Sequence, residues 1–200
     1  MSDPRRSSPS VARNREPILA VLRRVLPQRG RLLEIAAGTG EHGVFFAPAF
    51  PELDWQPTDV DPDTLTSIAA WQEAEPAPNL RAPAVLDTTT RPWRYSKLDA
   101  VLCINMIHAS PWEATVGLFE GAGEALVREG VLVTYGPYRV AGVHTAPSNA
   151  EFDQWLKGRD PRWGVRDLEV LQELATRCGF GDVERVPMPA NNQALIFEKG

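Results

Sequence analysis

The sequence predicts an α/β fold with a mostly parallel, seven-stranded sheet, helices on both of its faces and an antiparallel hairpin at its C-terminal end. Three observations predict it. Strand-like apolar runs alternate with helix-like segments along the chain, which is typical of a parallel sheet with right-handed crossovers. The first run breaks at Gly38 and Gly40 and leads directly into a helix-like stretch. Two strand-like segments, 183–186 and 194–197, follow the last expected helix, and we expect them to pair as a hairpin.

The N-terminal half contains three strands and the helices between them. Residues 1–12 are polar, so we expect a flexible tail before a single domain over residues 13–200. Asp61 is expected to cap a helix whose first residue, Pro62, is favoured at that position. The expected elements of this half are a helix from Asn14 to about Leu26, a strand over 31–36, a helix over 41–48, a strand over 54–58, a helix over 62–73 and a short strand over 84–86.

The C-terminal half begins with the most hydrophobic strand, residues 99–105, as expected of a central strand that is buried on both faces. Ser110 and Glu113 have the spacing of a capping box, which predicts a helix from there to about Arg128. Residues 136–165 show no clear period. The remaining expected elements are a strand over 131–135 after Gly130, a helix from Asp167 to Cys178, and the two strands of the hairpin.

Composition limits the classes of protein that the chain can belong to. Its 200 residues suit one domain, and 43% hydrophobic with 24% charged residues is typical of a soluble globular protein. No apolar run is long enough for a membrane span, and residues 1–15 lack the apolar segment of a secretory signal. The net charge of −5 disfavours nucleic acid as a partner. Cys103 and Cys178 are the only cysteines, which indicates a reduced, cytoplasmic chain. The cysteines and histidines are scattered and do not have the spacing of metal ligands.

The glycine turn after the first strand is the most informative motif. Residues 34–40 read Glu-Ile-Ala-Ala-Gly-Thr-Gly, and Asp59 stands at the end of the next strand. A strand, a glycine turn, a helix and an acid at the tip of the second strand is how doubly wound folds hold an adenosine. Glycine lets the backbone approach a ligand closely, because a Cβ there would collide with it. The motif therefore predicts a nucleoside cofactor, with both ribose hydroxyls bound by Asp59.

Two classes of cofactor fit this motif. Residues 38–43 read G-x-G-x-x-G, the dinucleotide fingerprint. Residues 34–40 read E-x-A-x-G-x-G, which resembles the first motif of class I S-adenosylmethionine-dependent methyltransferases, with Ala36 in place of its first glycine. The chain has no room for the substrate domain that dinucleotide dehydrogenases usually need, and its closing hairpin is how the Rossmann-like class I methyltransferase fold completes its sheet. These features favour S-adenosylmethionine over NAD(P).

Several further stretches carry a resemblance to one family. They include Asn105-Met106-Ile107-His108 and Tyr135-Gly136-Pro137-Tyr138, and the others lie at 13–19, 33–42, 55–59 and 148–156. Together they resemble the uncharacterised methyltransferase-like family known as domain of unknown function 938, over nearly all of the chain from Arg13 onward. The resemblance implies the class I fold and S-adenosylmethionine binding, and it implies no particular substrate.

The candidate cofactor-binding residues lie in the glycine turn and at the ends of the strands. Glu34 is placed near a ligand ammonium group, although it could equally bond backbone amides. Asp87, after the third strand, is placed against the adenine amino group, with a solvated turn aspartate as the alternative. The full set is Glu34, Ala36, Gly38, Thr39, Gly40, Asp59, Asp87 and Asn105.

The candidate catalytic residues are Asn105, His108 and Tyr135, at the carboxyl ends of the fourth and fifth strands. Ligands gather at this edge of an open α/β sheet. The pKa of an unperturbed histidine is near neutral, which suits His108 to act as a general base. The alternative is a structural histidine just before a helix cap. Tyr138, Asn149, Phe152 and Trp155 are expected to shape the acceptor pocket, although Phe152 and Trp155 could instead be core residues of a helix.

The sequence thus predicts an S-adenosylmethionine-dependent methyltransferase that acts on a small-molecule acceptor. Two other functions stay open. One is an NAD(P)-dependent oxidoreductase, which only the G-x-G-x-x-G reading favours. The other is a non-catalytic methyltransferase-like module that works through a protein partner.

Overall fold

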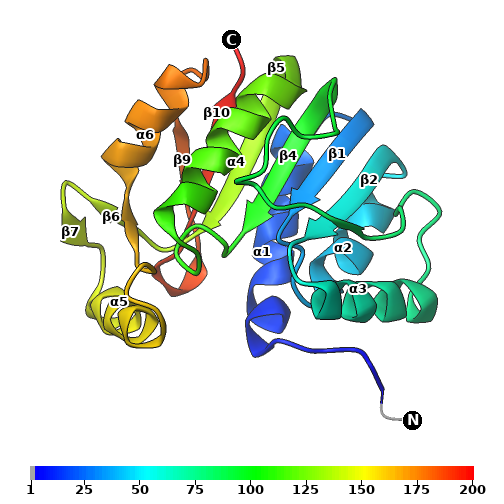
Figure 1. Ribbon diagram of the computed structural model, residues 1–200, viewed down its shortest axis with the longest axis horizontal. Helices are drawn as coiled ribbons and strands as arrows, with labels where there is room; N and C mark the ends of the chain where they lie inside the picture. The colour runs from blue at the N-terminus through cyan, green and yellow to red at the C-terminus, as the bar shows by residue number, and fades with distance from the viewer. Residues whose placement is uncertain (1–2) are drawn as a thin grey trace.

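A seven-stranded sheet forms the centre of the protein in the computed structural model, which describes residues 3–200 (Figure 1). Its strand order is β3-β2-β1-β4-β5-β10-β9. β1 to β5 pair in parallel, whereas β10 is antiparallel to both β5 and β9. The strands are β1 (Arg29–Ile35), β2 (Glu52–Asp59), β3 (Ala84–Val85), β4 (Leu98–Ile104), β5 (Leu126–Gly136), β9 (Glu184–Pro187) and β10 (Gln193–Glu198). The predicted fold class, with its C-terminal antiparallel hairpin, is confirmed.

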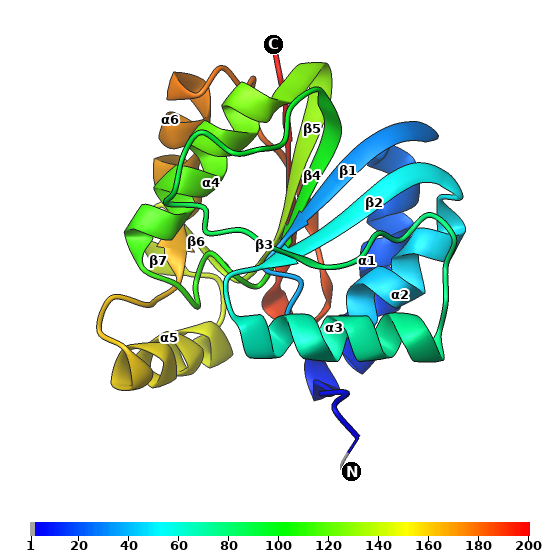
Figure 2. The ribbon, with the colours of Figure 1, turned by 45° about the vertical axis from the view of Figure 1, so that its right-hand side comes forward.

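Helices cover both faces of this sheet. Consecutive strand residues point to opposite faces, so Leu32 packs with α1 and α2 while Leu33 packs with α4 and α6. Figure 2 shows α3 and α5 at the same end of the sheet. The helices are α1 (Pro9–Val25), α2 (Glu41–Phe46), α3 (Pro62–Ala74), α4 (Trp112–Ala125), α5 (Pro147–Arg159) and α6 (Leu168–Arg177), with short 3₁₀ turns η1 (Ala47–Ala49) and η2 (Pro189–Asn191).

The first helix begins earlier than the sequence predicts. α1 starts at Pro9, and Asn14 is a buried residue inside the helix rather than its cap. Before the helix, the Arg6 amide donates to Ser67 of α3 at 2.8 Å, and the Ser8 amide donates to Glu41. The segment expected to be a flexible tail therefore makes defined contacts from Arg5 onward; its mobility, and the division into a tail and one domain, stay predictions.

The predicted capping box is wrong, whereas the predicted cap at Asp61 is confirmed. Asp61 accepts a hydrogen bond from the Asp63 amide at 2.9 Å, as a helix cap does. α4 begins only at Trp112, and the Ser110 hydroxyl is buried without a partner among the described residues. α4 also ends earlier than expected, because the chain enters β5 at Leu126 and the pairing with β4 is irregular there.

The segment without a clear period folds into a separate cap beside the main sheet. It contains α5 and a small three-stranded sheet of order β7-β6-β8. The strands of this small sheet are β6 (Tyr138–Val140), β7 (Val143–His144) and β8 (Arg166–Asp167). We call residues 138–167 the cap.

Candidate active site

The loop from β1 to α2 uses its two glycines for different purposes. Gly38 and Gly40 both have positive φ, +59° and +92°. A Cβ on Gly40 would lie 2.7 Å from the Ile68 Cα, so Gly40 lets α3 pack closely against the loop. A Cβ on Gly38 would meet nothing closer than the Ala36 carbonyl oxygen at 3.9 Å. Gly38 therefore leaves its backbone open toward a ligand, while Gly40 serves the packing of the protein itself.

Asp59, at the end of β2, is buried beside this loop. One of its carboxylate oxygens accepts from the Gly38 amide at 3.0 Å, and the other accepts from the Asp61 amide at 3.1 Å. A carboxylate has about four acceptor positions, so acceptor capacity remains for two further donors. Asp59 thus braces the glycine loop and is able to bind the hydroxyls of a ribose as well.

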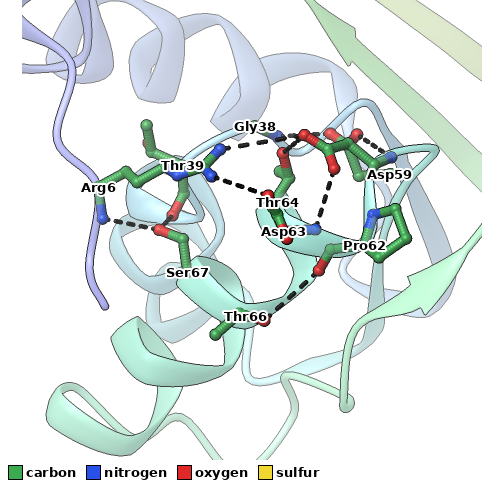
Figure 3. A network of polar contacts seen from close by, with 10 residues as sticks. Arg6, Gly38, Thr39, Asp59, Pro62, Asp63, Thr64, Thr66 and Ser67 are labelled. Carbon is green, nitrogen blue, oxygen red and sulfur yellow. Dashed lines mark hydrogen bonds and ion pairs between the residues drawn. The ribbon is translucent and has the colours of Figure 1, made fainter. Parts of the chain in front are cut away.

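A polar network joins the N-terminal segment to the glycine loop (Figure 3). Ser67 of α3 accepts from the Arg6 amide and donates to the Thr39 carbonyl oxygen, each at 2.8 Å. The Thr39 hydroxyl donates to Glu41. Thr39 is therefore occupied by contacts that hold the loop in place.

One large cavity, of about 830 Å³, lies at the carboxyl edge of the sheet. Five of the predicted cofactor-binding residues line it: Ala36, Gly38, Asp59, Asp87 and Asn105. The strand ends thus bring together residues from four separate parts of the sequence. The other three predicted residues, Glu34, Thr39 and Gly40, are not among the lining residues.

Glu34 is directed away from the cavity. Its side chain lies on the sheet face covered by α1 and α2, where it accepts from the Trp55 indole N–H at 2.8 Å. Burial raises the pKa of Glu34 to about 7, although the Trp55 hydrogen bond opposes this rise. In this position Glu34 contacts the core rather than a ligand ammonium group or backbone amides.

Of the three predicted catalytic residues, only Asn105 lines the cavity. It follows β4 with a positive φ of 61°. His108 is buried under Phe152 of α5, their ring centroids 5.4 Å apart, and its Nδ1 has no hydrogen-bond partner among the described residues. Burial, followed by the charge of Arg166, lowers the pKa of His108 to about 4.

Tyr135 lies on the opposite face of the sheet, toward α1. Burial raises its pKa, although hydrogen bonds with Asn14 and Asn192 oppose this rise. Asn14 also bonds the His42 imidazole at 2.9 Å, and burial lowers the pKa of His42 to about 4. Tyr135 and His108 therefore flank the end of the central strands from two sides rather than meeting in one place.

Other lining residues were not anticipated from the sequence. The sequence predicts only a helix cap at Ser110 and Glu113, and Asp160, Arg162 and Trp163 lie in the segment that lacks a period. The absence of a capping bond in α4 is visible only in the structure. The cap thus contributes a wall of the cavity.

The charge of the cavity is strongly one-sided. Its lining includes four carboxylates and a single guanidinium, that of Arg162. Arg162 pairs with Asp160 at 2.7 Å. The remaining carboxylates, Asp59, Asp87 and Glu113, favour a cationic ligand and oppose a phosphate.

Two further properties concern the described part of the chain. Across residues 3–200, no group of His, Cys, Asp and Glu side chains is placed to hold a metal ion. No helix of this region has the length and apolar character that a bilayer span requires.

Solved structures share this architecture. An O-methyltransferase family protein from Burkholderia thailandensis superimposes with a TM-score of 0.82 at 15% identity, covering 96% of this chain and 57% of that one. Human N-acetylserotonin methyltransferase, in complex with S-adenosylmethionine (SAM), superimposes with a TM-score of 0.77 at 14% identity. The match covers 96% of this chain and 53% of that one. An O-methyltransferase family 2 protein from Planctomyces limnophilus, in complex with apigenin, superimposes with a TM-score of 0.78 at 19% identity. The match covers 96% of this chain and 60% of that one. The chain thus spans little more than half the length of these proteins.

At such identities the likeness shows the fold and not the reaction. The sequence itself matches a family described as "Protein of unknown function (DUF938)" over residues 5–199. Because this match spans nearly the whole chain, the protein belongs to the DUF938 family and has the class I methyltransferase fold.

Proposed function

We propose that the protein is a SAM-dependent methyltransferase that acts on a small-molecule acceptor. The observation that carries this proposal is the acidic cavity at the carboxyl edge of the sheet, bounded by Gly38, Asp59 and Asp87. SAM bears a sulfonium and an ammonium group and no phosphate. A cavity with four carboxylates and one paired guanidinium suits such a ligand.

The same charge argues against a dinucleotide. A pyrophosphate bound at the start of α2 would lie near Glu41 and Asp59, and no lysine or arginine of the 36–43 loop is available to neutralise it. The third glycine of the literal fingerprint, Gly43, packs near the Glu34 carboxylate. Packing contacts therefore explain the second and third glycines of the G-x-G-x-x-G pattern, Gly40 and Gly43, without a dinucleotide.

The residues around the cavity suggest how the cofactor is held. Asp59 accepts from the ribose hydroxyls, and the open backbone at Ala36 and Gly38 faces the methionine part. Asp87 accepts from the adenine amino group, and Asn105 fixes the cofactor near its sulfur. When bound, SAM supplies an electrophilic methyl group, which passes to an acceptor lone pair while the S–CH₃ electrons remain on sulfur.

The acceptor is expected at the carboxyl ends of β4 and β5. Asn105 borders the cavity there, while Tyr135 and His108 lie near the same strand ends outside the cavity lining, Tyr135 on the α1 side and His108 against Phe152. The unpartnered Nδ1 of His108 is available to the acceptor once Phe152 moves aside. A neutral His108 positions the acceptor or accepts its proton, and exclusion of water by the cap strengthens these interactions.

A small acceptor agrees with two of the structural relatives. The human protein is named for N-acetylserotonin and the Planctomyces protein was solved with apigenin. Both are small molecules. The cavity, of about 830 Å³ and bounded on one side by Asp160, Arg162 and Trp163 of the cap, supports the same size of acceptor here.

Thermal denaturation with two ligands tests the cofactor. S-adenosylhomocysteine, the product, should raise the melting temperature because a ligand that binds only the native state stabilises it. NAD should have little effect, and the reverse ranking would overturn the proposal. Transfer of labelled methyl from SAM into a metabolite extract then distinguishes an enzyme from a module that binds the cofactor without reaction. His108→Ala should lower this transfer more than it weakens S-adenosylhomocysteine binding.

A further inference from the structure

The cap is fixed against the loop that follows β4. The Gly164 amide donates to the His108 carbonyl oxygen at 3.0 Å, and the Arg166 guanidinium donates to the Ser110 carbonyl oxygen at 2.9 Å. Within the cap, the Val165 amide donates to the buried Asp153 carboxylate at 2.7 Å. These bonds hold residues 160–166 in a defined position between α5 and the first turn of α4.

One aromatic side chain from this segment reaches the cavity. Trp163, which is half-buried, is the sole aromatic residue among those that line the cavity. The lining runs from Gly38 and Asp59 past Asp87 and Thr88 to the start of α4, and Trp163 and Arg162 complete it. The cavity wall beyond the ribose position is therefore built in part by the cap.

We propose that Trp163 closes the adenine end of the cofactor site and stacks on the purine ring. The inference rests on the proposed function, which places the ribose at Asp59. From there the adenine extends toward Asp87 and Thr88, and Trp163 is the aromatic side chain that lines the same cavity. Aromatic side chains bind nucleobases by stacking, because every base has a π-face.

This assignment gives the cap two roles at once. Phe152 of α5 covers His108, where the acceptor is expected, while Trp163, which lines the cavity, is the residue assigned to the adenine. The bond between Asp153, the residue next to Phe152, and Val165 joins these two parts of the cap. Cofactor binding at Trp163 is therefore coupled, through the Asp153–Val165 bond, to the position of the element that covers the acceptor site.

Calorimetric titration of Trp163 variants tests the stacking. The probes are S-adenosylhomocysteine and 5′-methylthioadenosine, which carries the adenine without the amino-acid part. Trp163→Ala should weaken both by a similar factor of about ten to a hundred, as expected for loss of a base–aromatic stack. Trp163→Phe should retain most of the affinity. Trp155→Ala is the matched control, because Trp155 lies in the same cap, is 50% exposed and does not line the cavity.

The outcomes separate this inference from the proposed function. Failure of the wild-type protein to bind S-adenosylhomocysteine overturns the proposed function and the inference with it. Normal binding by wild type and by Trp163→Ala overturns the inference alone. So does a result in which Arg162→Ala, and not Trp163→Ala, weakens both probes. If Trp163→Ala unfolds, Trp163→Leu and Trp163→Phe decide, since a stack requires the phenylalanine variant to bind more tightly than the leucine variant.

Discussion

The Asp59 carboxylate accepts a hydrogen bond from the Gly38 amide at 3.0 Å, which joins the end of β2 to the loop after β1. The residue that we assign to the ribose therefore also shapes the loop that we assign to the methionine part. A ligand that bridges the two would bind to a site whose halves are already positioned. This lowers the entropic cost of ordering the site on binding.

Asp59→Ala should weaken S-adenosylhomocysteine binding by about ten- to a hundred-fold, because hydrogen bonds to charged groups contribute roughly 1.5–3 kcal/mol. The affinity of Asp59→Asn for S-adenosylhomocysteine should lie between that of Asp59→Ala and that of wild type. The measurement is calorimetric titration, with circular dichroism to verify the fold. Asp61→Ala is the control, since Asp61 caps α3. If Asp61→Ala weakened binding and Asp59→Ala did not, the ribose would be assigned to the wrong acid.

Substitution of the two loop glycines should separate packing from ligand access. Gly40→Ala should destabilise the protein by more than about 2 kcal/mol, because backbone strain adds to a clash with the Ile68 backbone. Gly38→Ala should cost only the strain, about 1–2 kcal/mol, since the space around it is open. Urea denaturation measures both. Equal losses of stability would show that Ile68 yields to the added methyl group.

Glu34→Gln should change how stability depends on pH. The folded-state pKa of Glu34, about 7, lies above its ordinary value of 4.5, because burial disfavours the charge. The folded protein therefore binds this proton more tightly than the unfolded chain, and wild-type stability should fall as pH rises from about 4.5 to about 7.

The glutamine variant should not show this fall, because its side-chain oxygen still accepts from Trp55 and carries no charge. At pH 8 it should be more stable than wild type by on the order of 3 kcal/mol, since each pKa unit between 4.5 and about 7 corresponds to about 1.4 kcal/mol. Urea denaturation across the pH range measures this. Parallel curves for the two proteins would contradict the assignment of a raised pKa to Glu34.

The imidazole of His108 should remain neutral well below its ordinary range. Its pKa is lowered from 6.5 to about 4 by burial, with a contribution from Arg166. A lowered histidine pKa favours the neutral folded form, so this contribution to stability should be lost as pH falls from about 6.5 toward 4. NMR titration of the imidazole signals, assigned with His108→Asn, measures the pKa. A His108 titration near pH 6.5 would show that the ring reaches solvent.

The sheet and most of the candidate cofactor site follow from local sequence signals. Strand-like apolar runs, glycines at a strand end and an acid after the next strand are each visible within a few residues. Because parallel strands end at one edge, these signals also predict which residues meet. The confirmed fold class, a mostly parallel sheet with a C-terminal antiparallel hairpin, and the shared cavity of Gly38, Asp59 and Asp87 rest on such patterns.

The features that could not be predicted depend on contacts between distant residues. The spacing of Ser110 and Glu113 fits a capping box, yet Arg166, far along the chain, holds the Ser110 carbonyl, and α4 starts later. The reason for glycine at position 40 is a contact with Ile68. The bounds of α5 could not be predicted because the helix lacks a clear apolar stripe: Phe152 packs on His108 while Trp155 is half exposed. The position of Glu34, by contrast, follows from the sequence, since the alternation of side chains along β1 places Glu34 on the same face as Leu32.

Gln193 offers a last test at the edge where the acceptor is expected. It pairs with Gly136 across β10 and β5, and the His108 ring lies against Gly136, so the three residues share one face of the sheet. Both polar atoms of the Gln193 side chain are buried without a partner among the described residues. A buried amide without hydrogen bonds costs about 1–3 kcal/mol.

Gln193→Leu should therefore raise the free energy of unfolding by about 1 kcal/mol or more, because it removes this cost and keeps a similar volume. If the amide serves the acceptor, the same variant should lower methyl transfer without changing S-adenosylhomocysteine affinity. Gln154→Leu, on the exposed face of α5, is the matched control. Urea denaturation measures the first effect and label transfer the second. A loss of stability in Gln193→Leu would mean that the amide has a partner, such as a buried water, in the folded protein.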